Sequence, residues 1–262
     1  MPRLLVLSTA LCVGCAGGSP LLHPAQVLPS GEVRAVAGAS GRVATGALAD
    51  ALRKARQEGF ATPATTSYAE GALVAAAVAP GIAPAAGARV GVGSGFEGGI
   101  GYTGRGARID LRHAFASGGF AFSAGVGVSV PFYGRSMESL LPGVDVGQLH
   151  GYGADVPLLV GWASQAGLYT FWAGARGGYE HVVIERLSSE PKDSGLSPSP
   201  VGLTADRVWG GALVGFAVGF RRLHVAFEVE ADYQTLRGNY AGRAARLEGV
   251  SLTPSSALWW RF

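Results

Sequence analysis

Apolar and polar residues alternate along most of the chain after residue 87. Between residues 223 and 233 the odd positions are apolar or aromatic, while Glu228, Glu230 and Asp232 occupy the even positions between them. A period of two places the two sets of side chains on opposite faces of a β-strand. The pattern therefore predicts an all-β protein whose sheet has one apolar face and one polar face.

Ten segments carry this alternation, and the first of them is weak. The connections between later segments alternate in length, and the longer strands reach 14 to 17 residues, where five or six is usual in soluble proteins. A soluble sandwich would show the same alternation, so the strand and connection lengths are what favour a membrane barrel. The expected strands are 32–38, 87–93, 96–103, 106–115, 119–132, 150–163, 168–184, 205–220, 223–236 and 247–262. The short connections are 94–95, 116–118, 164–167 and 221–222, and the longer ones are 133–149, 185–204 and 237–246.

One helix is expected near the N-terminus. Residues 44–58 are good helix formers, Leu48 and Leu52 share one face, and Gly59 follows the end. The Ala-rich stretch 68–84 fits either a helix or a strand. Residues 16–30 are rich in proline and small residues, which is typical of a tether.

The first fifteen residues have the pattern of a secretory signal peptide. A positive start is followed by an apolar run and then by small residues. Gly14 immediately before Cys15 favours acylation of Cys15 as in a bacterial lipoprotein, and ordinary cleavage after Ala16 is the alternative. Both cysteines lie in this segment, so residues 16–262 contain no cysteine to form a disulfide framework.

Composition adds a further argument for a membrane barrel. The chain has 42 glycines and is 48% hydrophobic but only 15% charged. After the signal peptide it has no apolar run of about 18 residues, which a helical membrane span would need. The net charge of +3 is spread out without a Lys/Arg cluster, so no nucleic-acid partner is expected.

The chain ends with one aliphatic and two aromatic residues at alternate positions, Leu258, Trp260 and Phe262. This ending resembles the C-terminal insertion signal of the bacterial outer-membrane β-barrel superfamily, and the resemblance covers residues 31–262. It implies an antiparallel up-and-down transmembrane barrel with a helical insertion at 44–58, in the outer membrane of a Gram-negative bacterium. Ten strands fit the even numbers of such barrels, with eight or twelve as alternatives. The implied partners are outer-membrane lipid, lipopolysaccharide and the barrel-assembly machinery.

The polar face of the strands is predicted to line the lumen. Five cations and seven anions do not form a ring of one sign, as an ion-selective pore would require. A barrel of this size has an interior that side chains can fill, and buried charges must be paired. We therefore expect a largely filled, charge-paired lumen, with a narrow porin-like channel as the alternative. The expected lumen residues are Arg89, Glu97, Arg108, Asp110, Arg112, Asp155, Arg176, Glu180, Glu228, Glu230, Asp232 and Arg261.

Two glycines around Arg105 predict a tight turn that sets the register of two strands. With Gly104 and Arg105 at the centre of the turn, Tyr102 faces Ala107 on the outer side. On the inner side, Glu97 then faces Arg112, and we expect the two to form an ion pair with Arg108 and Asp110 nearby. A slip of one residue would turn these charges toward lipid.

The aromatic residues of 150–184 are predicted to form membrane-interface belts. A turn at 164–167 would place Trp162 opposite Tyr169 and Tyr152 opposite Tyr179. The same register would pair His150 with His181. Such a histidine pair can bind a metal ion or a phosphate, but polar interface material is the favoured interpretation, and no metal site is predicted.

Signals of catalysis are weak. Ser136, Ser188 and Ser189 lie in loops near the two histidines, but the chain has no G-x-S-x-G motif. No cofactor motif is present, so we expect a protein that is not an enzyme and has no cofactor. The predicted function is a structural or surface-interaction role. A small-solute channel and an enzyme that modifies lipid or lipopolysaccharide are the two alternatives.

Overall fold

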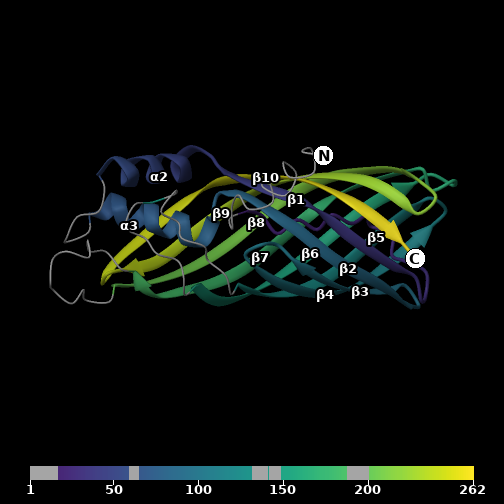
Figure 1. The fold of residues 1–262 in the computed structure, drawn as a ribbon, viewed down its shortest axis with the longest axis horizontal. Helices are drawn as coiled ribbons and strands as arrows, with labels where there is room; N and C mark the ends of the chain where they lie inside the picture. Colours follow the sequence, from purple (N-terminus) through teal and green to yellow (C-terminus); the bar gives the residue numbers. More distant parts are fainter. Residues whose placement is uncertain (1–16, 59–64, 132–140, 142–148, 188–200) are drawn as a thin grey trace, which may run out of the picture.

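The computed structural model describes residues 17–58, 65–131, 141, 149–187 and 201–262. Ten antiparallel strands close into an up-and-down barrel, which confirms the predicted fold class and strand number (Figure 1). The strands are β1 (Val33–Ala44), β2 (Gly81–Gly93), β3 (Phe96–Tyr102), β4 (Gly106–Ser117), β5 (Phe120–Pro131), β6 (Leu149–Ala163), β7 (Tyr169–Leu187), β8 (Val201–Phe220), β9 (Leu223–Tyr240) and β10 (Arg243–Arg261).

Strand β1 closes the barrel by pairing with β10 on one side and with β2 on the other. Arg34 lies opposite Arg261 in the first pairing and opposite Arg89 in the second. The backbone N–H of Phe262 donates to the carbonyl of Val33 at 2.9 Å, so the last residue also takes part in closure. The barrel therefore has no free strand edge along this seam.

The alternation predicted from the sequence places apolar side chains on the outside. In β9, Val225, Phe227 and Val229 are exposed, while Glu228 and Glu230 between them are buried in the lumen. An outward apolar face is the arrangement of a barrel in lipid, where the surrounding solvent is hydrocarbon. None of the helices among the described residues is long and apolar enough to cross a membrane.

The two ends of the barrel differ. We call "turn end" the end with the short connections 94–95, 118–119, 164–168 and 221–222 and with the C-terminus. We call "loop end" the opposite end, where the strands on either side of the longer connections 45–80, 132–148 and 188–200 begin or end. In Figure 1 the turn end lies on the right, and the loop end, with the helices, lies on the left.

Several strands are longer than expected, mainly toward the loop end. The first runs to Ala44, the second begins at Gly81, and the last begins at Arg243. The expected long connection 237–246 was wrong, because β9 and β10 meet in a two-residue turn at Ala241 and Gly242, both with positive φ. The missed strand ends carry arginines and small polar residues, which hide the alternation.

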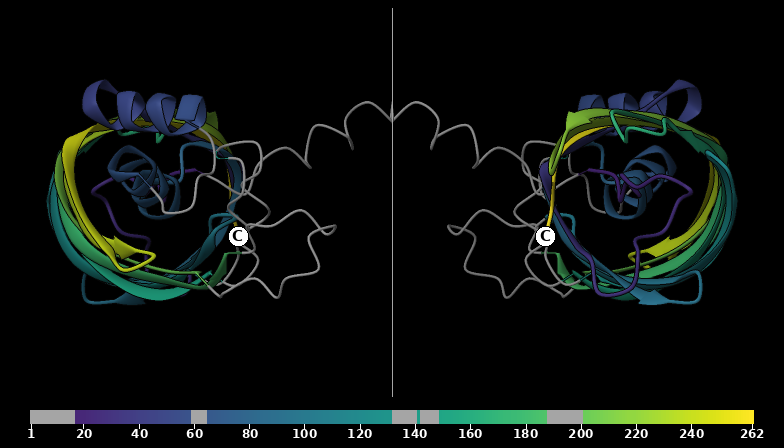
Figure 2. Two further views of the ribbon diagram at one scale, coloured as in Figure 1. Left: turned by 90° about the vertical axis from the view of Figure 1, so that its left-hand side faces the viewer. Right: turned by 90° about the vertical axis from the view of Figure 1, so that its right-hand side faces the viewer.

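The expected helix is present as α2 (Gly46–Glu58), and its apolar face is buried. The Ala-rich stretch forms a second helix, α3 (Thr66–Leu73), which continues as the short π-helix η2 (Val74–Val78). In Figure 2, α3 lies inside the ring of strands and α2 lies outside it. The two helices approach closely, because a Cβ atom on Gly71 would come within 2.3 Å of Ala55 Cβ.

The helices α3 and η2 fill the lumen at the loop end. Their buried side chains pack against Ile184, Leu203, Leu236 and Tyr240 from strands β7, β8 and β9. The side chain of Thr65 accepts a hydrogen bond from the backbone N–H of Tyr68 at 3.1 Å and so caps the start of α3. This end of the lumen is therefore closed by packed apolar residues.

Candidate functional site

Residues 17–30, which we call the strap, run through the lumen. The sequence predicted a tether for this segment, and the structure corrects that prediction: the side chains from Leu21 to Ala25 are buried, and so is Leu28. The N–H of Gly17 donates to Ala79 at the loop end, and the N–H of Gly31 donates to Gly91 at the turn end. Figure 2 shows this segment inside the ring of strands. The strap thus crosses the barrel from one end to the other.

Glu228 of β9 holds the middle of the strap. The backbone N–H groups of Leu21 and Leu22 donate to its two carboxylate oxygens at 2.8 and 3.0 Å. Trp172 Nε1 donates to the same carboxylate at 2.9 Å. Two successive backbone N–H groups on one anion are typical of anion-binding turns. Leu22 takes a left-handed conformation with φ of 48° to do so, which a non-glycine residue adopts only at some cost in free energy.

Glu97 of β3 holds the end of the strap. It accepts the N–H of Leu28 at 2.8 Å and, through its other oxygen, Arg112 Nη2 at 2.8 Å. Arg112 also donates to the backbone carbonyls of Pro24 and Gln26. The predicted Glu97–Arg112 pair is confirmed, and the register between β3 and β4 is the predicted one, with Tyr102 opposite Ala107.

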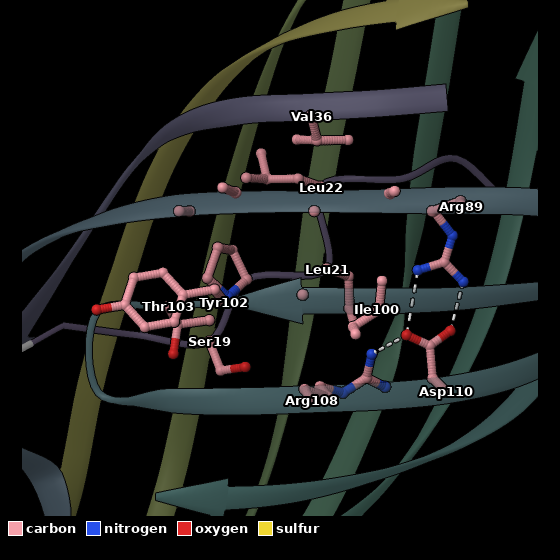
Figure 3. A pocket seen from close by; sticks show the side chains of 16 residues that line it. Ser19, Leu21, Leu22, Val36, Arg89, Ile100, Tyr102, Thr103, Arg108 and Asp110 are labelled. Atoms are coloured by element: carbon pink, nitrogen blue, oxygen red, sulfur yellow. Dashed lines mark hydrogen bonds and ion pairs between the residues drawn. The ribbon is translucent and has the colours of Figure 1, made fainter. Parts of the chain in front are cut away.

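The pair belongs to a larger network on β2, β4 and β6. Arg89 bridges Glu97 and Asp110, and Arg108 bridges Asp110 and Asp155. In Figure 3, Arg89 and Arg108 reach Asp110 from two sides, and the strap residues Leu21 and Leu22 lie beside them. A cavity of about 50 Å³ separates the strap from this part of the wall. Every charge of this network has a partner of opposite sign, as burial requires.

Arg176 links this network to β9. Its Nε donates to Asp155 at 2.9 Å, and its Nη1 lies 3.4 Å from Glu230. Nη1 also donates to the carbonyl of Ser19 in the strap at 2.6 Å. The charged residues of the wall therefore bind the strap at three levels, at Ser19, at Leu21 and Leu22, and at Leu28.

All twelve predicted lumen residues lie on the inward face of the barrel, where Asp110, Glu180 and Arg261 are half-buried and the other nine are buried. Four further arginines line the lumen. Arg34 and Arg42 belong to the weakly patterned first strand, and Arg207 belongs to β8. Alternation within those strands would have found these three. Arg105 sits in a turn, and no pattern predicts that its side chain folds inward to pair with Glu180 at 2.8 Å.

The expected belt residues Tyr152, Trp162, Tyr169 and Tyr179 are all exposed on the outer face. Their predicted cross-strand pairs were wrong, because β6 and β7 are shifted by two residues, with Trp162 opposite Phe171. The hydroxyl of Ser164 accepts hydrogen bonds from the N–H groups of Leu168 and Tyr169, which lengthens the turn. A shift of two preserves the faces, so these aromatic residues still point outward.

The expected pairing of His150 with His181 is absent, because His150 lies opposite Val183 and His181 lies opposite Tyr152. His181 Nδ1 instead lies 2.8 Å from Asp206 of β8, which also accepts a hydrogen bond from the Tyr179 hydroxyl at 2.5 Å. No group of three or more potential metal-ligating side chains occurs among the residues that the structure describes. Ser136, Ser188 and Ser189 lie outside the described residues, as does Cys15.

The C-terminal residues Leu258, Trp260 and Phe262 project outward from β10. Trp260 lies opposite Ala35 of β1, and Arg261 donates its backbone N–H to the carbonyl of Arg222 at 2.9 Å. The segment proposed as an insertion signal therefore also forms the closing seam of the barrel.

Neither a protein-family model nor a curated protein sequence matches the chain. The solved structures that match the chain include the two that follow. Neisserial surface protein A is 12% identical, with 88% of this chain and 94% of that chain covered and a TM-score of 0.35. The CymD monoaromatic hydrocarbon channel is 8% identical, with 90% and 89% covered and a TM-score of 0.24. The strand pairing of the chain itself establishes its fold as a closed ten-stranded antiparallel barrel.

Proposed function

We propose that the protein is a small outer-membrane β-barrel of a Gram-negative bacterium with a structural or surface-interaction role and a lumen that does not conduct. The observation that carries this proposal is the strap, which crosses the lumen and is hydrogen-bonded to Glu97, Glu228 and Arg176. Three cavities beside the strap measure about 50, 50 and 30 Å³, and each has room for a few water molecules. Separate cavities of this size do not make a continuous aqueous path.

The surface role is assigned to the loop end. In bacterial barrels the longer connections face the outside of the cell and the short turns face the periplasm. By this rule, α2 would present its polar face at the cell surface, and Asp50, Arg53 and Lys54 on that face are exposed. Outer-membrane lipid would surround the apolar outer wall, and lipopolysaccharide headgroups would lie near Tyr152 and Tyr179.

No reaction is assigned to the molecule. Most acids and bases of the lumen near the strap, such as Arg108, Asp155 and Arg176, are paired with one another, and the strap occupies the space that a substrate would need. On the outer wall, His181 is bonded to Asp206 and to no serine of the described residues. A nucleophile bonded to its base is the arrangement that acyl-transfer enzymes require.

Conductance tests the closed lumen. The full-length protein, inserted into planar lipid bilayers, is expected to give no resolved current steps, because the strap and its charge network fill the lumen. A general porin measured in the same apparatus serves as the positive control. Discrete steps from the full-length protein would contradict the closed lumen and favour the small-solute channel.

Deletion of residues 260–262 tests assembly in the outer membrane. It removes the backbone bond from Phe262 to Val33 and the outward aromatic residues proposed as the signal for the barrel-assembly machinery. The truncated protein is expected to remain unassembled in the periplasm, as measured by fractionation and by heat-modifiable migration on gels. Phe262→Ala keeps the backbone seam and is the control that isolates the side chain. Normal assembly of the truncated chain would disprove the proposed signal.

A further inference from the structure

A polar cavity of about 50 Å³ lies between the strap and the barrel wall near the loop end. Its lining includes Arg42 of β1, Arg207 of β8, and Arg105 from the turn between β3 and β4. A second cavity of about 30 Å³ shares Arg42, Arg207 and Ser129 in its wall. Both spaces are large enough to hold water molecules or one small ion.

Two of the three arginines share one ion-pair partner, and the third has none within 4.0 Å among the described residues. Glu180 lies 2.8 Å from Arg105 through one oxygen and 2.8 Å from Arg207 through the other. Arg42 donates through Nη1 to the carbonyl of Val78 at 3.2 Å, and no carboxylate of the described residues lies within 4.0 Å of its guanidinium nitrogens. The side chains that line the cavity therefore carry an excess of positive charge, while Asp232 of β9, which is outside the lining, also attracts Arg42 and Arg207.

Two of the guanidinium groups also have donors without acceptors. The Nε atoms of Arg42 and Arg207 are buried and have no hydrogen-bond partner. The two side chains are 6% and 4% exposed, so bulk water does not solvate these donors. Buried charges in proteins are normally paired, and buried donors are normally bonded. An occupant of the cavity that carries negative charge would satisfy both requirements.

We propose that this cavity binds a small inorganic anion, chloride or phosphate, between Arg42, Arg105 and Arg207. A guanidinium group offers several donors in one plane and binds such anions well. The hydroxyl groups of Thr103 and Ser129, which line the same cavity, supply further neutral donors. The site is separate from the strap contacts of Glu97 and Glu228, and it does not depend on whether the lumen conducts.

The barrel wall is lowest where this cavity lies. Strand β3 ends at Tyr102, β4 begins at Gly106 and β5 ends at Pro131, and the cavity is lined at this rim by Thr103, Gly106 and Pro131. On the opposite side, β8 and β9 remain paired as far as Leu203 and Tyr240. The cavity therefore lies beside the rim that β3, β4 and β5 form.

Isothermal titration calorimetry tests the site on the full-length protein in detergent micelles. The buffer contains gluconate as a large, poorly binding anion, and sodium chloride or sodium phosphate is titrated separately. We expect saturable binding of at least one of the two, and the salt that saturates identifies the ion. Arg42→Met and Arg207→Met should each weaken binding about tenfold or more, because each removes a charge-assisted hydrogen bond.

Arg53→Met is the matched control, because Arg53 lies on the exposed face of α2 and pairs with Asp50 there. Its binding should equal that of the unmodified protein. The absence of saturable binding, or equal affinity in Arg42→Met, would overturn the proposal. If the lumen variants do not fold, anomalous scattering from bromide-soaked crystals of the unmodified protein locates the ion instead. A bromide peak in this cavity supports a chloride site, an arsenic peak after a soak in arsenate supports a phosphate site, and the absence of both overturns the proposal.

Discussion

Deletion of residues 19–28 is expected to turn the closed barrel into a conducting one when α3 and η2, which fill the loop end of the lumen, are also replaced by a short glycine-serine linker. The deletion removes the buried side chains of Leu21, Leu22 and Leu28 and every strap contact with Glu228, Glu97 and Arg176. The ten-stranded wall keeps all its backbone pairing, because the deleted residues lie before β1 and the replaced helices lie between β1 and β2. In planar bilayers the variant should show discrete current steps where the full-length protein shows none.

A covalent lock provides the matched control for the deletion. A Cβ atom on Gly18 would lie 3.1 Å from Thr253 Cβ, and a small outward shift of the strap would bring the two to the roughly 3.5–4.5 Å found across a disulfide. The double variant Gly18→Cys and Thr253→Cys should hold the strap in place and stay silent under oxidising conditions. Current steps from the locked protein, or silence from a correctly folded deletion variant, would show that the strap does not close the lumen.

Glu97→Ala is expected to destabilise the barrel more than any other single substitution considered. Glu97 is 0% exposed and is bonded to Arg89, to Arg112 and to the N–H of Leu28. Its removal leaves two buried guanidinium groups without one of their ion-pair partners. A change of this kind lowers the free energy of unfolding by about 3–5 kcal/mol. Urea unfolding in lipid vesicles measures the loss as a lower midpoint.

A second substitution distinguishes two causes of the lost stability, an unpaired buried charge and the loss of packing. Adding Arg112→Ala to Glu97→Ala should recover part of the lost stability, since one of the unpaired charges is gone. Glu248→Ala is the matched control, because Glu248 pairs with Arg246 on the exposed surface and such pairs contribute about 0–1 kcal/mol. A Glu97→Ala variant as stable as Glu248→Ala would show that the network does not stabilise the barrel.

The hairpin of β3 and β4 shows how much of the site the sequence predicts. Its two-residue turn allows only one register between the two strands. The alternation of charged and apolar residues determines which side chains face the lumen. Together they allowed Glu97 to be paired with Arg112 from the sequence. The hairpin of β6 and β7 failed because the register there depends on hydrogen bonds of the Ser164 side chain. Periodicity predicts which residues of a strand share a face. The hydrogen bonds of the turn decide which residue of the neighbouring strand lies opposite each of them.

The strap could not be predicted from its own residues. Its proline-rich composition is typical of a linker, and its fixed conformation comes from bonds to the wall rather than from local propensity. The residues that hold it, such as Glu228 and Arg176, were correctly placed in the lumen, but the partners expected for lumen charges were other charged side chains. The carboxylate of Glu228 accepts hydrogen bonds from backbone N–H groups of the strap. These bonds can be recognised only in the three-dimensional structure.

The position of the strap also restricts the order in which the barrel assembles. The strap lies inside a closed ring, and one mouth of that ring is filled by α3 and η2. Threading a chain through a finished ring is therefore obstructed, so the sheet must curl around the strap before β1 meets β10. Contacts such as Leu22 with Glu228, which are 206 residues apart in sequence, are then formed early. Such long-range contacts slow folding. In this barrel the sheet forms around the strap.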